Sequence, residues 1–146
     1  MRSHVEVSYV RQQLKLALDR SRRDAQERRQ RTADAVRTFE PFLADVATPV
    51  FRMLAMAMKA EGLPFTVSTP GGSIRLSADN AREDVIEVLL DSSVDPPQVI
   101  GRMHRARGSR TLAEEVQLKP GAPVDTIDKD DVLRFLLTVL GPWFER

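Results

Sequence analysis

The stretch FTVSTPGGSIRLSA, residues 65–78, decides the fold class of this chain. Apolar and polar side chains alternate on both sides of its Pro-Gly-Gly turn, and a period of two around such a turn predicts a β-hairpin. A second run of this type, residues 98–118, surrounds Gly108 and Ser109. The β-branched run Asp84–Ser92 lies between the two and favours a strand, with a short helix as the alternative. We therefore predict a meander of four or five antiparallel strands.

Two apolar helices are predicted on either side of this meander. Thr48 and Pro49 are suited to the N-cap and first turn of a helix that ends before Gly62. This segment is apolar nearly all round, which predicts burial, and its three methionines are interpreted as flexible core packing rather than a peptide groove or a self-association surface. Asp128 is expected to cap a last helix, which carries apolar residues from Val132 to Phe144 and covers the sheet.

The N-terminal segment predicts a long and polar helix. There is no Gly or Pro from Gln12 to Arg37, and opposite charges recur four residues apart, each pair contributing about 0.2–0.5 kcal/mol. The helix is expected to begin between Val5 and Gln12, and the alternation of Val5, Val7 and Tyr9 with polar residues is equally compatible with a short strand before it. Ala25 is the only apolar residue between Asp19 and Thr32. This part of the helix therefore either projects into solvent or pairs as a weak coiled coil.

These elements define an α+β protein: a long N-terminal helix, a buried helix, an antiparallel sheet and a closing C-terminal helix. The length of 146 residues suits one domain with an appendage. We expect residues 1–48 to form a partly exposed helical extension and residues 49–146 to form a compact α+β body.

Composition excludes several classes of function. The chain has no cysteine, which excludes disulfides, thiol nucleophiles and cysteine-based metal sites. The net charge is only +1, but residues 1–40 hold ten basic and six acidic side chains, whereas residues 41–100 hold four basic and eight acidic ones. Such a split is compatible with nucleic-acid contact or with self-association between opposite ends.

No apolar run of 18 residues and no signal-peptide pattern is evident, so a cytoplasmic, bacterial-type protein without membrane contact is expected.

Residues that commonly carry catalysis or bind metals are scarce. His4 lies near the N-terminus, and His104 lies among the arginines of the second hairpin, where an exposed strand position is expected. The acidic cluster from Asp125 to Asp131 lacks the glycine and glutamate of an EF-hand, and is interpreted as a helix cap. Pro70–Ser73 lacks the lysine and following helix of a phosphate loop. We therefore expect no catalytic residue, no metal and no cofactor.

Two arginine clusters are the remaining candidates for binding. A solvated face is one interpretation; contact with nucleic-acid phosphate or with an acidic protein surface is another. Acidic residues interleave with the helical cluster, and no aromatic residue lies near either cluster for base stacking. The candidate contact residues are Arg22, Arg23, Arg28 and Arg29 in the long helix, and Arg102, Arg105, Arg107 and Arg110 in the second hairpin.

The hypothesis that follows is a non-enzymatic protein–protein interaction or assembly module, which forms a homodimer and binds an unidentified protein. Its helices carry more apolar surface than one small sheet covers, so we expect self-association, with Leu140, Trp143 and Phe144 as candidate contacts. The alternative is a nucleic-acid-associated protein that binds phosphate backbone through the arginine clusters. An enzyme is compatible only with a site built from Asp, Glu, Ser or Arg that sequence does not reveal.

Overall fold

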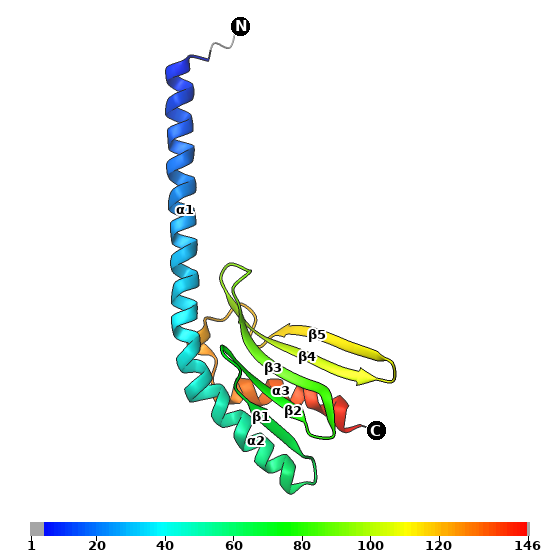
Figure 1. Cartoon of the computed structure of the whole chain (residues 1–146). Helices are drawn as coiled ribbons and strands as arrows, with labels where there is room; N and C mark the ends of the chain where they lie inside the picture. Colours follow the sequence, from blue (N-terminus) through cyan, green and yellow to red (C-terminus); the bar gives the residue numbers. More distant parts are fainter. Residues whose placement is uncertain (1–4, 146) are drawn as a thin grey trace.

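One continuous helical run forms the N-terminal part of the molecule. The computed structural model describes residues 5–145, and Figure 1 shows helix α1 (Val7–Phe42) rising away from the rest of the chain. A five-residue π-helical segment, η1 (Leu43–Ala47), connects it to helix α2 (Thr48–Ala60). The predicted start of the long helix, between Val5 and Gln12, is confirmed.

The predicted cap at Thr48 is wrong. Thr48 has helical backbone angles, φ −60° and ψ −47°, and no side chain caps the start of α2. Pro41 and Pro49 lie on either side of η1, and each lacks the N–H that would bond four residues back. The helical run continues past both prolines, because a π-helical turn and a bend accommodate them without a break in the helix.

The five strands form an antiparallel meander in the order β1-β2-β3-β4-β5, as predicted. Gly108 begins the two-residue turn of the second hairpin at φ +62°, which is why glycine is needed there. The strands are β1 (Phe65–Ser68), β2 (Ser73–Ala78), β3 (Ala81–Asp91), β4 (Gln98–Arg107) and β5 (Arg110–Gln117).

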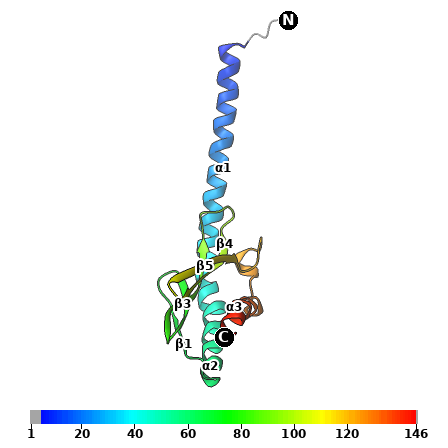
Figure 2. The ribbon, with the colours of Figure 1, turned by 90° about the vertical axis from the view of Figure 1, so that its right-hand side faces the viewer.

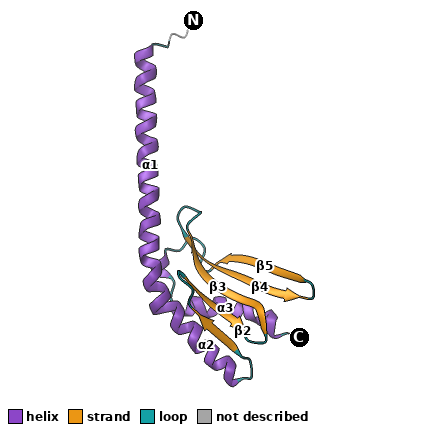
Figure 3. Ribbon diagram, viewed as in Figure 1, coloured by secondary structure: helices purple, strands orange, loops and turns teal. Residues whose placement is uncertain are grey.

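Helices α2 and α3 (Lys129–Phe144) cover one face of the sheet, so the body has two layers (Figures 2 and 3). A short 3-10 turn, η2 (Val124–Thr126), precedes α3. The predicted cap of α3 is confirmed: Asp128 accepts from the backbone N–H of Asp131 at 2.8 Å, and the Asp131 carboxylate accepts from the N–H of Asp128 at 3.0 Å. The largest fully buried side chains are Phe51, Ile74, Leu76, Ile86, Val88, Val132, Leu136 and Leu140.

Gly101 allows α3 to approach the sheet closely. A Cβ atom at this position would lie 2.0 Å from Cζ of Phe135, so the aromatic ring occupies the space that a side chain would fill. In the sheet, Ile74 and Val88 lie in the same row as Gly101 and are fully buried. The absence of a side chain in this row therefore seats Phe135 against the sheet.

The body includes more of the N-terminal segment than the predicted extension of residues 1–48 implies. Phe39 and Phe42 are 5% and 4% exposed and belong to the core, and Ala47 is fully buried. Every residue of α1 from Val7 to Asp24 is exposed. The α+β class is confirmed, but the exposed part of the extension ends well before residue 48. Whether the two predicted units fold separately stays a prediction.

Candidate interaction site

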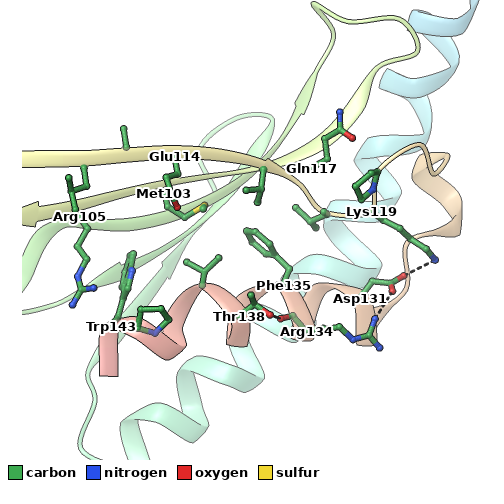
Figure 4. Close-up of a pocket in the computed structure, with 17 residues that line it drawn as sticks. Met103, Arg105, Glu114, Gln117, Lys119, Asp131, Arg134, Phe135, Thr138 and Trp143 are labelled. Carbon is green, nitrogen blue, oxygen red and sulfur yellow. Dashed lines mark hydrogen bonds and ion pairs between the residues drawn. The ribbon is translucent and has the colours of Figure 1, made fainter. Parts of the chain in front are cut away.

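A groove separates the β4–β5 hairpin from helix α3 (Figure 4). Strands are spaced about 4.8 Å apart and packed helices about 10 Å apart, so two helices cover about four strands. In this sheet of five strands, β5 is the strand without a helix beneath it, and all eight of its residues are exposed. The resulting groove has a volume of about 900 Å³.

Most of the groove lining is apolar. Met103 and Phe135 are 7% exposed and form its inner wall. Leu112 and Val116 of β5 are 52% and 41% exposed. Their partners across the ladder, Arg105 and Gly101, place them on the face of the sheet that carries Phe135. The groove is therefore a partly uncovered extension of the core.

Fixed charges mark one end of the groove. Nζ of Lys119 lies 3.1 Å from the Asp131 carboxylate, and Nη1 of Arg134 lies 3.5 Å from it. The pKa of Asp131 lies below its ordinary value, mainly because its carboxylate accepts the backbone N–H of Asp128, with a further contribution from Lys119. These charges are paired with one another within the chain, so at this end of the groove they stabilise the fold.

At the other end, Arg105 lies over Trp143. The guanidinium carbon is 5.5 Å from the centroid of the indole ring, within the range of a cation–π interaction (Figure 4). Trp143 is half-buried and lines the groove. The predicted self-association residues therefore differ in their environment: Leu140 is fully buried in the chain's own core, and Phe144 is 44% exposed. Leu140 is unavailable to a partner, and this part of the prediction is corrected.

The arginine cluster of the second hairpin is divided between the two faces of the sheet. Arg102 lies on the face away from α3, where it is paired with Glu115 at 2.9 Å. Arg107 and Arg110 are exposed and directly opposite each other on the face that also carries Arg105. Strand alternation separates residues that are close in sequence, so the four arginines do not form one surface.

A row of alternating charges crosses the open face of the sheet. Arg75, Glu87, Arg102 and Glu115 are successive partners from β2 to β5. Burial by itself would raise the pKa of Glu87, but hydrogen bonds from Ser73 and Arg75, both at 2.8 Å, hold that pKa below its ordinary value. Cross-strand pairs of this kind stabilise the sheet. This face is therefore a balanced polar surface, not a basic one.

The helical arginines have two different environments. Arg22, Arg23, Arg28 and Arg29 are exposed on α1. Arg31 instead makes a two-pronged ion pair with Asp95, at 2.8 and 2.7 Å, which joins α1 to the β3–β4 loop. The hydrogen bond from Arg31 lowers the pKa of Asp95.

The remaining residues singled out from the sequence have ordinary structural positions. His104 is half-buried on the open face of the sheet, opposite Val85. Ser73 donates its backbone N–H to Pro70 at 3.1 Å, which confirms the predicted turn. Within residues 5–145, no group of three or more His, Asp or Glu side chains is placed to hold a metal. His4 lies outside the described residues.

The groove itself was not predicted. Leu112 and Val116 are four residues apart in β5 and in a strand share one face with Glu114, so this pattern predicts a strand with a partly apolar face. It does not reveal that the helix beneath the sheet stops short of this strand. The missing information is the width of the helical layer.

The helical run Val7–Ala60 contains an 18-residue window with a mean hydropathy of 1.3, so by length and composition alone it is apolar enough to cross a membrane. Buried residues of the body make up 28% of that window. Core helices of soluble proteins have the same property.

Comparison of the chain with protein-family models, curated proteins and solved structures finds no match.

Proposed function

We propose that this chain is a non-enzymatic assembly module that associates with a second copy of itself through the exposed part of α1, residues 7–30, which we name the arm. The carrying observation is that the arm stands clear of the body while presenting apolar side chains to solvent (Figure 1). Leu14 and Leu18 are 56% and 43% exposed. Burial of each such side chain is favourable by about 1.5–3 kcal/mol.

The apolar face of the arm, which we name the seam, continues along α1 into the face that packs against the body. Leu18, Ala25, Thr32 and Phe39 are spaced by seven residues, so they follow one face of α1. At Phe39 this face is buried in the core, and at Leu18 it is uncovered. A helix of matching length and pattern is a suitable cover, and a second copy of the arm has both.

The space around the arm favours an antiparallel pair of arms. Because the body occupies the seam at Phe39, two parallel arms would bring both bodies to the same place. An antiparallel pair places Leu14 of one copy against Leu18 of the other.

The test is a pair of variants that differ in the face they alter. Leu14→Glu with Leu18→Glu places charges in the seam, whereas Leu16→Glu alters a residue that is 51% exposed on the opposite face. Sedimentation analysis at tens of micromolar should give the same assembly for the parent chain and for L16E, and a smaller assembly for the double variant. Circular dichroism should show that the body stays folded in all three. A monomeric parent chain, or equal loss in L16E, would refute the proposal.

Binding to nucleic acid remains the alternative, and one observation favours it. Arg105, Arg107 and Arg110 share a face of the β4–β5 hairpin, and the last two are exposed at its tip. The support is weaker than for assembly, because Arg102 and Arg31 are paired with acidic side chains of the same chain.

A further inference from the structure

We propose that the free edge of β5 is a second self-association site, at which β5 of one copy pairs antiparallel with β5 of another across a two-fold axis at Leu112. The sheets of the two copies would then form one continuous sheet. This inference concerns a surface remote in sequence from the arm and does not depend on the function proposed above.

The first observation is that β5 is a long, regular edge strand whose protection is limited to charged side chains. It pairs with β4 over eight residues without a register shift, and it contains neither proline nor glycine. Natural edge strands are commonly shortened, bulged, interrupted by proline or covered, because their unpaired backbone groups recruit other strands. At the opposite edge, β1 has only four residues and packs against α2.

The second observation is that the side chains of β5 match their own sequence in one antiparallel register. With Leu112 opposite Leu112 of the second copy, Arg110 faces Glu114 on both sides of the axis, and all of these side chains share one face. Within the described residues, neither Arg110 nor Glu114 forms an ion pair in the single chain.

Other registers centred on this strand are less favourable. An axis at Ala113 sets Leu112 against Glu114, and an axis at Glu114 sets two carboxylates directly opposite each other. Like charges directly opposite are destabilising, and an apolar residue opposite a charge gains little. The Leu112 register is the one that combines an apolar contact with two opposite-charge pairs, and it covers a leucine that is 52% exposed.

Because the chain has no cysteine, a single introduced cysteine tests this register directly. In full-length Leu112→Cys the two sulfur atoms would meet at the axis, where directly opposite Cβ atoms are close to disulfide distance. We expect mild oxidation to give a disulfide-linked dimer. Val116→Cys is the matched control: Val116 is 41% exposed on the same face, and this register sets it opposite Gly108 of the second copy.

Charge reversal supplies an independent measurement. In the L112C chain, Arg110→Glu or Glu114→Arg alone sets like charges opposite each other twice, and should slow cross-linking about tenfold. The two reversals together restore opposite charges and should restore the rate. Adding Leu14→Glu and Leu18→Glu removes the arm contact but should leave cross-linking by L112C in place, so failure of either proposal is distinguishable from failure of the other.

Three outcomes would overturn the β5 proposal. The first is a folded L112C chain that stays a free thiol under oxidation, which is expected if another protein's strand occupies this edge. The second is a V116C chain that cross-links as fast as L112C. The third is a double charge reversal that cross-links as slowly as the single reversals. Circular dichroism of each variant establishes that the sheet is intact before cross-linking is compared.

Discussion

Replacement of Gly101 by alanine should destabilise the body through one identifiable contact. The new Cβ would lie 2.0 Å from Cζ and 2.5 Å from Cε1 of Phe135, whereas carbon atoms in contact prefer about 3.5–4.0 Å. The ring must therefore move by about 1.5–2 Å, and the groove beside it is the available space. Overpacking of this kind costs about 1–3 kcal/mol, which for a chain of this size lowers the melting temperature by about 3–10 °C.

The assay is urea and thermal denaturation of G101A, Phe135→Leu and the double variant. Because the shorter side chain leaves room for the new methyl group, the double variant should be more stable than the sum of the single effects predicts. Gly141→Ala is the control: a Cβ at Gly141 in α3 meets nothing within 4 Å. That change should be neutral or stabilising. A neutral G101A, or strictly additive effects, would refute the assignment of Phe135 as the contact.

Three further predictions concern other parts of the molecule. Asp131→Asn should lower the free energy of unfolding by about 1 kcal/mol at neutral pH. Because the pKa of Asp131 lies below its ordinary value of 3.8, the stabilisation by its carboxylate is present above that value and is lost as the pH falls through the folded-state pKa. The unfolding free energies of the two proteins, measured by urea denaturation at each pH, should therefore become equal in acid, and a difference that stays constant with pH would contradict this. Removal of residues 1–30 should leave a cooperatively unfolding body, since Phe39 and Phe42 are retained; a molten fragment by near-ultraviolet circular dichroism would show that the arm stabilises the core. If the hairpin tip binds phosphate backbone, Arg107→Glu should weaken binding to mixed DNA in a salt-dependent manner, and undetectable binding of the parent chain at low salt would dismiss that alternative.

Local patterns in the sequence were sufficient for the strands and for the last helix. Alternation around Pro70 and Gly108 predicts both hairpins because turn chemistry and side-chain period agree there. Asp128 predicts the start of α3 because its capping box is formed by residues three apart in sequence. Each of these signals is contained within a few neighbouring residues.

The errors arose where distant packing overrides local preference. Thr48 and Pro49 resemble a helix start, but the helix passes through them because the aromatic residues before η1 and those after it share one core. Leu140 was predicted to be a contact surface on hydrophobicity alone, which does not distinguish an inner helix face from an outer one. The exposed edge of β5 depends on how far the helical layer extends beneath the sheet, and no local pattern reports that distance.

The junction between α1 and the body has a mechanical consequence. The 25 residues from Val7 to Arg31 rise about 36 Å at 1.5 Å per residue, and the helix enters the core without an intervening loop. A flexible linker of that length would average about 24–29 Å between its ends and sample every direction. The arm is instead a rigid helical extension, so a molecule bound at its N-terminal end is held at a fixed distance and in a fixed direction from the sheet.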